Sequence, residues 1–395
     1  MMQSAALAAE TLSAASLETV ETPALALDLA KVDRNITRLR SRLAQLGVAF
    51  RPHVKTSKSL DVARRLFPEG TGPITVSTLA EAEYFADGGF SDITYAVGLS
   101  LDKIDRARQL AAQGLRLSVL IDTVEQAHAL AEAARDGGAM PAVLIEIDCD
   151  GHRGGVLPDD PALLVIADML AQGGVNLEGV LTHAGESYNA RGGDGLPEAA
   201  EGERAAAVAA AQMLRAAGHA APVVSVGSTP TAHFARDLTG VTEVRAGVFT
   251  FFDLVMHGIG VCEVDDIAVS VVATVIGHRP EKGWILTDGG WMAMSRDRGT
   301  QRHPVDQGYG LVCDIDGNPF GDVIVEDASQ EHGIIKVRPG SDGTLPELPI
   351  GARVRILPNH ACATCAQHEV YNVVDGSATG QGRVITAQWP RMRGW

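Results

Sequence analysis

The segment 51–55 places a lysine directly after a short apolar run. The run extends from Leu46 to Phe50, and the cluster Arg-Pro-His-Val-Lys follows it. An isolated lysine is ordinarily a surface residue. A lysine at the carboxyl end of an early barrel strand can also hold pyridoxal phosphate as a Schiff base. Lys55 is therefore the first candidate for covalent chemistry.

A second candidate, near the other end of the chain, is the His-x-Cys pair of His360 and Cys362. In an extended segment, side chains two apart share a face, so this pair can converge on one metal ion. Imidazole and thiolate suit zinc, whereas manganese or magnesium favours oxygen ligands. An isolated pair is equally compatible with a hydrogen-bonded histidine and a small buried cysteine. Cys365 and His368 extend the pattern, which leaves open a closed structural zinc site with four protein ligands.

Three further candidates lie in loops that contain glycine. Arg153 lies in the string DGHRGG. Beside the pyridine nitrogen of a cofactor, an arginine would keep that nitrogen unprotonated; the alternative is a surface ion pair. His183 and Tyr188, in THAGESY, could contact the cofactor ring and phosphate, although each is more often a packed, hydrogen-bonded residue.

The elements that must position these residues alternate between about residues 24 and 258. Short β-branched runs are separated by Ala/Leu-rich segments with helical spacing, for example 79–87, 124–135 and 199–217. The alternation predicts parallel strands in a (β/α)8 barrel, with an open doubly wound sheet as the alternative. Eight runs are expected as strands: 47–51, 74–77, 93–96, 117–122, 142–148, 177–182, 223–226 and 242–246.

The loops after the seventh and eighth runs consist largely of small residues. They read Gly227-Ser228-Thr229-Pro230-Thr231 and Arg245-Ala246-Gly247-Val248. Barrel enzymes often bind phosphate there, and small residues let backbone N–H groups approach it. A helix beginning near Pro230 would add a favourable dipole. Such a turn alone is common in plain loops, so its place in the series carries the prediction.

From about residue 259 the pattern changes to β-rich runs separated by turns. These runs are 267–276, 284–287, 334–337, 352–357 and 370–374. No repeated helical crossover joins them, which predicts a second, mostly β domain over 259–395 that part of 1–23 would join. The barrel domain is then expected over 24–258.

The amino-acid composition argues against several classes of binding partner. The 395 residues include 33 Lys and Arg against 49 Asp and Glu, and the net charge of −16 argues against nucleic acid. No apolar run approaches the ~20 residues that span a bilayer, so no membrane association is expected. The N-terminus does not resemble a secretory signal. The odd number of cysteines, 5, favours a reduced, cytoplasmic setting.

Motifs along most of the chain resemble a known family. In order, they read RPHVKTSKS, DGHRGGV, LTHAGESY, SVGSTPT, VRAGVFTFFDL, DGGWMAMSRDRGT, SQEHG and PNHACAT. Together they resemble the fold-type III pyridoxal phosphate enzymes of the eukaryotic-type D-serine dehydratase group, with D-threonine aldolases as more distant relatives. The resemblance extends from about Thr22 to His368. It implies an alanine-racemase-like barrel, a C-terminal β domain and a homodimer with active sites near the subunit interface.

The resemblance also implies roles for single residues. Lys55 would be the Schiff-base lysine and Arg153 the partner of the pyridine nitrogen. His360 and Cys362 would bind one divalent ion: zinc, manganese or magnesium. Around the ring and phosphate it places His183, Tyr188, Thr229, Gly247 and Val248.

The implied activity is that of a lyase acting on a small D-configured 3-hydroxy amino acid. Loss of water would yield a 2-oxo acid and ammonia, with D-threo-3-hydroxyaspartate giving oxaloacetate as the first expectation and D-serine as an alternative. A D-threonine or 3-hydroxy-D-aspartate aldolase is a further alternative, although the D-threonine aldolases resemble a His-x-Asp pattern where this chain has Cys362. The segment 295–303 offers cationic partners for a substrate β-carboxylate, and it is equally compatible with a solvated loop.

Overall fold

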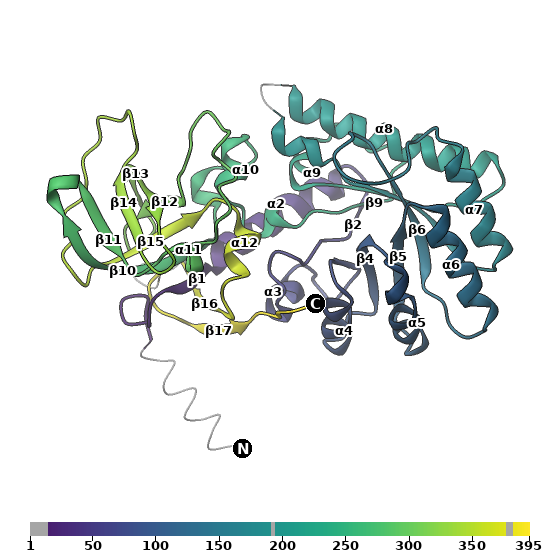
Figure 1. Ribbon diagram of the computed structural model, residues 1–395, viewed down its shortest axis with the longest axis horizontal. Helices are drawn as coiled ribbons and strands as arrows, with labels where there is room; N and C mark the ends of the chain where they lie inside the picture. Colours follow the sequence, from purple (N-terminus) through teal and green to yellow (C-terminus); the bar gives the residue numbers. More distant parts are fainter. Residues whose placement is uncertain (1–14, 191–193, 377–381) are drawn as a thin grey trace, which may run out of the picture. The chain divides into compact units, whose positions relative to one another are not determined.

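The computed structural model describes residues 15–190, 194–376 and 382–395 in two compact units (Figure 1). One unit comprises Thr37–Gly247 with Gly394–Trp395. The other comprises the described residues up to Ile36 together with Val248–Arg393. The helix α2 (Leu29–Gln45) begins in the second unit and ends in the first.

The first unit is built on a parallel sheet of eight strands in the order β2-β9-β8-β7-β6-β5-β4-β3. A parallel bridge between His53 and Thr75 joins the two ends of this order, and Val54 N donates to Thr75 O at 2.9 Å. The expected barrel fold is therefore confirmed, and the open doubly wound sheet is wrong. The strands are β2 (Ala49–Phe50), β3 (Ile74–Val76), β4 (Asp92–Gly98), β5 (Arg116–Ile121), β6 (Ala142–Ile147), β7 (Leu177–Thr182), β8 (Val223–Val226) and β9 (Glu243–Val244).

Helices follow the barrel strands, and two of them, α4 and α6, begin at side-chain caps on the residue before the helix. Thr78 accepts a hydrogen bond from Glu81 N, and Thr123 forms a capping box with Gln126. Figure 1 shows α4 to α8 around the strands of this unit. The helices of this unit are α3 (Leu60–Arg65), α4 (Leu79–Asp87), α5 (Ile104–Ala112), α6 (Val124–Arg135), α7 (Ala162–Gln172), α8 (Gly195–Ala216) and α9 (Thr229–Phe234).

The second unit is a nine-stranded sheet in the order β11-β14-β13-β12-β15-β10-β1-β16-β17. An additional pairing of β10 with β11 closes its first six strands into a ring. The strands are β1 (Ala24–Asp28), β10 (Val269–Arg279), β11 (Trp284–Thr287), β12 (Gly310–Cys313), β13 (Pro319–Ala328), β14 (Gly333–Val337), β15 (Arg353–Pro358), β16 (Val370–Val374) and β17 (Ala387–Pro390). Three short helices accompany them: α10 (Leu254–Gly258), α11 (Trp291–Met294) and α12 (Ala361–Cys365).

The strand β1 differs from the sequence-based boundary, which assigned residues from 24 onward to the barrel. It lies between β10, its antiparallel partner, and β16, its parallel partner. All five of its residues are buried. Neighbouring strands cover both edges, and Ala24 and Ala26 pack in a buried cluster with Leu17 and Ile385. The segment before β1 also packs within the second unit, because Leu17 is buried and its backbone N donates to Arg383 O at 2.7 Å.

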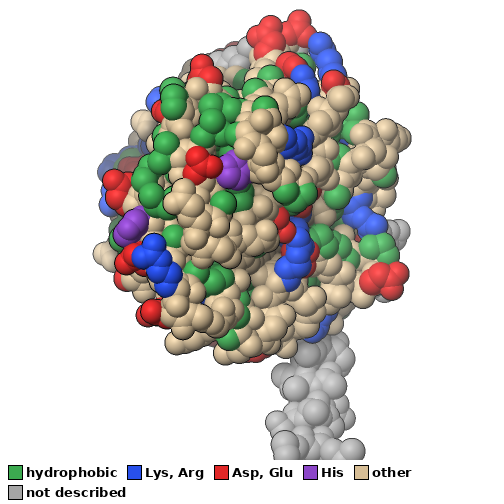
Figure 2. Space-filling model, turned by 90° about the vertical axis from the view of Figure 1, so that its right-hand side faces the viewer, with side chains coloured by type: hydrophobic (Ala, Val, Ile, Leu, Met, Phe, Trp, Pro, Cys, Tyr) green, Lys and Arg blue, Asp and Glu red, His purple; other side chains and the backbone are tan. Residues whose placement is uncertain are grey.

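No helix of the described residues is long and apolar enough to cross a membrane. Figure 2 shows one face of the molecule, on which acidic and basic side chains are interspersed over its coloured part.

Candidate active site

Lys55 lies in the loop that follows β2. Hydrogen bonds from Val54 N to Thr75 O, at 2.9 Å, and from Thr75 N to Pro52 O, at 2.8 Å, hold this loop beside β3. The other lysine of the motif, Lys58, forms a 2.9 Å ion pair with the fully buried carboxylate of Glu81. Lys58 is thereby engaged with a buried partner, and Lys55 stays the candidate for chemistry because of its place after β2.

Two histidines, His53 and His183, lie close enough to Lys55 for its charge to lower their pKa values. Burial lowers the pKa of His53 well below its usual value, and the charges of Lys55 and Arg245 lower it further. Burial and Lys55 also lower the pKa of His183 to about 3, although a hydrogen bond with the Gly227 carbonyl opposes the shift. Both rings are therefore neutral near pH 7. The His183 Nδ1 to Gly227 O distance is 3.0 Å, so Nδ1 carries the proton in the neutral ring and Nε2 does not.

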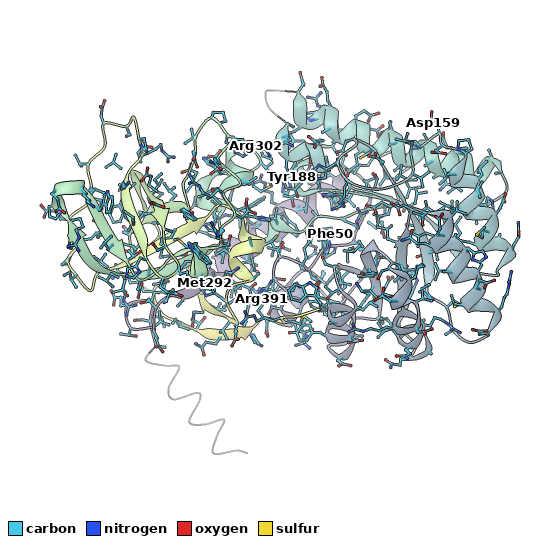
Figure 3. All side chains as sticks on the ribbon, viewed as in Figure 1. Phe50, Asp159, Tyr188, Met292, Arg302 and Arg391 are labelled. Atoms are coloured by element: carbon cyan, nitrogen blue, oxygen red, sulfur yellow. The ribbon has the colours of Figure 1, made fainter. Side chains whose placement is uncertain are left out.

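The loops after β7 and β8 meet near these rings. The centroid of the His183 ring lies 6.2 Å from that of Tyr188, which is labelled in Figure 3, and the two rings are tilted by 49°. The hydroxyl oxygens of Ser187 and Ser228 are 2.9 Å apart. The structure thus brings the loop that carries His183 and Tyr188, after β7, against the Gly227–Thr231 loop, after β8.

The predicted phosphate loops have the close backbone approach expected of them. Gly227 has φ +135°, and a Cβ there would lie 1.9 Å from Arg245 O, so only glycine fits. A Cβ at Gly247 would lie 3.1 Å from His53 O. Ser228 caps α9 by accepting from Thr231 N at 3.2 Å, and Thr229 is buried in its first turn. Val248 begins the 3₁₀ turn Val248–Thr250. Small residues and backbone N–H groups at this edge fit a phosphate.

Arg153 lies in the loop after β6 and is 60% exposed. Its Nη2 is 3.6 Å from Glu146 Oε1, and that carboxylate is nearly buried. Burial raises the pKa of Glu146, whereas the charge of Arg153 lowers it. Arg153 thus forms an ion pair, as the alternative hypothesis for this residue expected. Its role at a pyridine nitrogen stays a prediction.

A buried arginine of the barrel was not among the predicted site residues. Arg245 donates from Nη2 to Thr182 O at 2.6 Å and from Nη1 to Ser225 Oγ at 2.7 Å. Burial lowers its pKa to about 10, although the charges of Glu203 and Glu243 oppose the shift, so the guanidinium is protonated at neutral pH. The signal in the sequence was an arginine within the last predicted strand, 242–246.

His360 and Cys362 lie at the junction of β15 and α12 rather than on one extended strand. The strand ends at Pro358, His360 is the N-cap of α12, and Cys362 lies in the first helical turn. The expected extended conformation is therefore wrong. Its physical cause is the buried carboxylate of Asp253. Oδ2 accepts from Ala361 N at 2.9 Å and so supports the start of α12, while Oδ1 caps α10 through Met256 N at 2.9 Å. The two side chains still meet, because Cys362 hydrogen-bonds with the His360 ring.

A carboxylate orients the His360 ring from its other side. His360 Nδ1 lies 2.6 Å from Asp297 Oδ2. Burial would lower the pKa of His360, but the charge of Cys362 and the hydrogen bond with Asp297 outweigh it and raise the pKa to about 11. Metal-binding histidines typically donate their second ring nitrogen to a carboxylate in this way. Nitrogen and sulfur donors from one turn, with a supported imidazole, fit a divalent ion such as zinc.

Cys365 and His368 do not complete a four-ligand site. Cys365 is fully buried and hydrogen-bonds with Tyr371, while His368 Nε2 bonds to Ala293 O at 2.8 Å. In the part of the chain that the structure describes, no group of three or more His, Cys, Asp or Glu side chains could hold a metal. The closed structural zinc site is therefore wrong, because these two side chains are committed elsewhere.

The arginine-rich segment 295–303 is tied to the same turn. Asp297 reaches His360, and Thr300 donates to Asn359 Oδ1 at 2.6 Å. Arg298 pairs with Asp306 at 2.8 Å and lies over Tyr309, whereas Arg296 lies 5.1 Å over Trp291. Arg302, labelled in Figure 3, is exposed.

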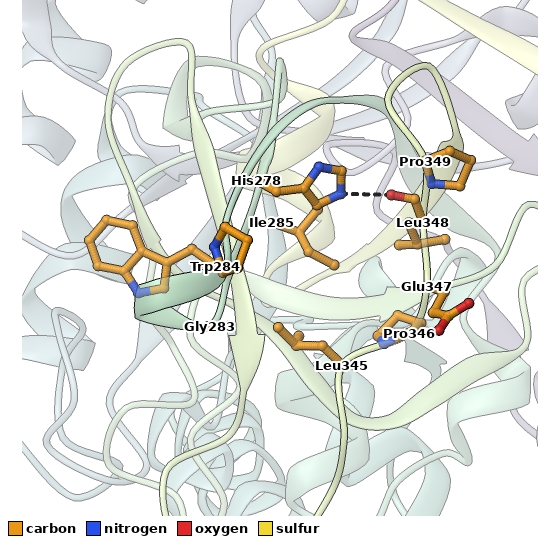
Figure 4. A pocket seen from close by; sticks show the side chains of 10 residues that line it. His278, Gly283, Trp284, Ile285, Leu345, Pro346, Glu347, Leu348 and Pro349 are labelled. Carbon is orange, nitrogen blue, oxygen red and sulfur yellow. Dashed lines mark hydrogen bonds between the residues drawn. The ribbon is translucent and has the colours of Figure 1, made fainter.

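A separate pocket of about 580 Å³ lies on the second unit (Figure 4). The indole of Trp284 and the segment Leu345–Pro349 line it, and His278 Nε2 donates to Leu348 O at 2.7 Å. None of the predicted site residues lines this pocket.

Comparison with known proteins defines the class of this chain. Residues 27–255 match the N-terminal domain of alanine racemase, and residues 268–374 match the serine dehydratase domain. The chain belongs to the fold-type III pyridoxal phosphate enzymes of the D-serine dehydratase group, which confirms the predicted family. The family implies pyridoxal phosphate as the cofactor.

Individual relatives match along nearly the whole chain. The chain is 51% identical to D-threo-3-hydroxyaspartate dehydratase of Delftia sp., with 96% of this chain and 99% of the relative covered. It is 30% identical to D-serine dehydratase of Dictyostelium discoideum, over 91% and 94% of the two chains. Among solved structures, a Cys-to-Ala variant of D-threo-3-hydroxyaspartate dehydratase in the metal-free form has a TM-score of 0.91 at 50% identity, covering 96% and 100%.

Proposed function

We propose that this chain is a pyridoxal phosphate- and divalent-metal-dependent dehydratase that converts D-threo-3-hydroxyaspartate to oxaloacetate and ammonia. The observation that carries the proposal is the 51% identity to a dehydratase of that substrate over 96% of this chain. The pairing of His360 with Cys362 supports it, because elimination of hydroxide needs an electrophile at the leaving oxygen.

Lys55 is the residue proposed to hold the cofactor and move the proton. Bound pyridoxal phosphate supplies an electron sink that makes the Cα–H of an attached amino acid acidic. With its amine free, Lys55 would take the α-proton of the substrate at Nζ as general base. His53 and His183 are neutral near pH 7, so neither provides a competing imidazolium as proton donor.

The neighbouring loops are proposed to hold the rest of the cofactor. Backbone N–H groups and hydroxyls of Gly227, Ser228 and Thr229, with Gly247 and Val248, suit the phosphate. His183 and Tyr188 suit the ring and its phosphate edge. Arg153 would leave its ion pair with Glu146 to face the pyridine nitrogen.

His360 and Cys362 are proposed to hold one divalent ion, with zinc favoured by their nitrogen and sulfur donors over manganese or magnesium. The ion supplies a Lewis acid that makes the 3-hydroxyl of the substrate a better leaving group. Asp297 holds the imidazole through Nδ1, at 2.6 Å, which presents the other ring nitrogen as the ligand.

The proposed setting is a homodimer in the cytoplasm. The homodimer follows from the family resemblance alone. The cytoplasmic location is supported by the five cysteines, all of which are free thiols in the structure.

One experiment separates the candidate reactions. The purified protein, supplied with pyridoxal phosphate and zinc or manganese, is incubated separately with D-threo-3-hydroxyaspartate, D-serine and D-threonine. We expect oxaloacetate and ammonia from the first substrate at the highest kcat/KM. Pyruvate from D-serine as the preferred reaction would identify a D-serine dehydratase, and glycine with an aldehyde would identify an aldolase.

A further inference from the structure

Glu203 is a carboxylate in an otherwise apolar helix face. It lies on α8 and is only 2% exposed. The buried residues of this helix recur at helical spacing, so Glu203 occupies a position where the pattern calls for a small apolar side chain. They are Leu196, Ala200, Glu203, Ala207, Ala210, Ala211 and Leu214. Burial of a carboxylate costs free energy unless its oxygens accept hydrogen bonds, so the oxygens of Glu203 need partners.

One oxygen of Glu203 joins two loops of the barrel. Oε1 accepts from Ala184 N at 2.8 Å and from Gly227 N at 3.0 Å. Ala184 follows His183 in the loop after β7, and Gly227 begins the loop after β8. The same oxygen therefore ties both loops that carry the proposed ring and phosphate contacts.

The surroundings of Glu203 hold its carboxylate in place. Arg245, which is protonated and buried, lies close enough for their charges to attract each other. Burial raises the pKa of Glu203, whereas a hydrogen bond with Thr231 and the two backbone N–H donors lower it. Thr231 belongs to α9, so the carboxylate also contacts the helix that follows the phosphate loop.

Two other contacts join these loops. His183 Nδ1 donates to Gly227 O at 3.0 Å, and the hydroxyl oxygens of Ser187 and Ser228 lie 2.9 Å apart. Of these connections, only that of Glu203 holds two backbone amides on one buried atom. A displacement of its oxygen would therefore shift both loops together.

We propose that Glu203 is a positioning residue that holds the β7 and β8 loops in the spacing required to bind pyridoxal phosphate. It does not touch the reacting atoms, and it acts through the backbone at Ala184 and Gly227. The inference rests on the proposed function, because the ligand of these loops is the cofactor of that proposal.

The test compares Glu203→Ala and Glu203→Gln with Glu201→Ala. Glu201 lies on the same helix and pairs with Arg204 at 2.6 Å at the surface, so its loss removes a carboxylate without touching either loop. Two quantities are measured in cofactor-free protein: the Kd for added pyridoxal phosphate, by absorbance titration, and the hydrogen-exchange rates of peptides spanning 183–190 and 226–231. Steady-state kcat and KM are measured after saturation with cofactor.

Glu203→Ala is expected to weaken cofactor binding about 10- to 100-fold, the range found for residues that orient a ligand set, and to speed exchange in both peptides. Glu203→Gln retains an acceptor oxygen and is expected to fall between wild type and Glu203→Ala. Glu201→Ala should match wild type. Unchanged Kd and exchange in Glu203→Ala would overturn the role, as would faster exchange in one loop only.

The design separates this inference from the proposed function. If wild type failed to bind pyridoxal phosphate, the proposed function would fall, while the exchange rates would still report whether Glu203 joins the loops. If wild type bound the cofactor and Glu203→Ala bound it equally well, only the role of Glu203 would fall. Should Glu203→Ala not fold, the decision passes to Glu203→Gln. A weaker Kd than that of wild type with faster exchange in both peptides supports the role, and a Kd and exchange rates equal to those of wild type overturn it.

Discussion

Two histidines, one in each unit, have pKa values displaced in opposite directions. His183 in the barrel falls to about 3, because burial and the cations Lys55, Arg153 and Arg245 disfavour its charged form. His360 in the second unit rises to about 11 despite its burial, because Cys362 and Asp297 favour the charged form. The barrel site is thus cationic and suits an anionic cofactor, whereas the second site is anionic and suits a metal cation.

The two sites also differ in how they are assembled. The barrel candidates come from loops after β2, β6, β7, β8 and β9, so their geometry depends on buried connections such as those of Glu203 and Arg245. His360 and Cys362 come from one turn, which Asp253 supports. Changes in the barrel should therefore affect cofactor binding, and changes in that turn should affect the metal alone.

The largest expected effect is at Lys55. Lys55→Ala should lower kcat by about 10²- to 10⁴-fold or more, because the general base is lost together with the covalent attachment. Borohydride should attach the cofactor to wild type and to Lys58→Arg, which preserves the ion pair with Glu81, but not to Lys55→Ala. Mass spectrometry of the reduced protein checks the attachment site. A reduced adduct in Lys55→Ala without substrate would show that another lysine holds the cofactor.

Loss of the metal should come next in size and should leave the barrel site intact. Chelation should remove the metal, and Cys362→Ala should weaken its binding by about 10- to 100-fold or more. Both should abolish dehydration while the bound pyridoxal phosphate remains. Metal content and cofactor absorbance are measured on the same sample. Full turnover by metal-free Cys362→Ala would remove the Lewis-acid role.

Asp297→Asn provides a graded control for that experiment. It keeps the shape of the side chain that contacts His360 Nδ1 and removes its charge. A smaller loss of metal affinity than in Cys362→Ala, again with cofactor retained, would sharpen the separation of the two sites. Loss of cofactor in either variant would contradict it.

Substrate choice should depend on the cationic segment of the second unit. An arginine that binds a β-carboxylate contributes roughly 1.5–3 kcal/mol, or about a 10- to 150-fold preference. Replacing Arg296, Arg298, Arg302 and His303 one at a time should identify a position that lowers kcat/KM for 3-hydroxyaspartate and leaves D-serine turnover nearly unchanged. Arg302 is the first choice because it is exposed. Equal losses on both substrates at every position would exclude the segment.

The smallest expected effect is the pH dependence of stability in the cofactor-free protein. Because the pKa of His183 is about 3 in the folded state and its ordinary value is 6.5, only the unfolded chain takes up this proton between those values. The free energy of unfolding should therefore fall as pH falls below about 6.5, by at most about 1.4 kcal/mol per pH unit. Urea denaturation at pH 7 and pH 5 should show a weaker pH dependence for His183→Asn than for wild type. His128→Gln, which replaces an exposed histidine, should keep the wild-type dependence.

Local pattern was sufficient for much of the fold. Each of the eight predicted barrel runs overlaps one observed strand, and the predicted helices 79–87 and 124–135 coincide with α4 and α6. Strands β1, β12, β13 and β17 were missed. For β1 the reason is physical, since its identity depends on pairing with β10 and β16, which lie more than two hundred positions further along the chain. No local period reports such a pairing.

The candidate sites likewise combine features that local motifs predicted with features that depend on distant residues. Motif spacing pointed to Lys55 and to His360 with Cys362, and the structure brings that pair into contact. It did not predict that Cys362 would lie in a helical turn, because the cause is Asp253, more than one hundred positions earlier in the chain. Arg245 and Glu203 were missed for a related reason: a charged residue in an apolar run has meaning only when its buried partners are known.

The amino-acid sequence by itself determined the family, the succession of barrel strands and the residue types available for chemistry, because these follow from motifs and short-range periodicity. Tertiary structure decided which charges share a buried environment. His183 and His360 have the same side chain, yet their pKa values diverge because one ring faces cations and the other a carboxylate and a thiol. Glu203 acquired its partners only when α8 packed against the ends of β7 and β8, since desolvation and Coulomb energy depend on distances that the order of residues does not specify.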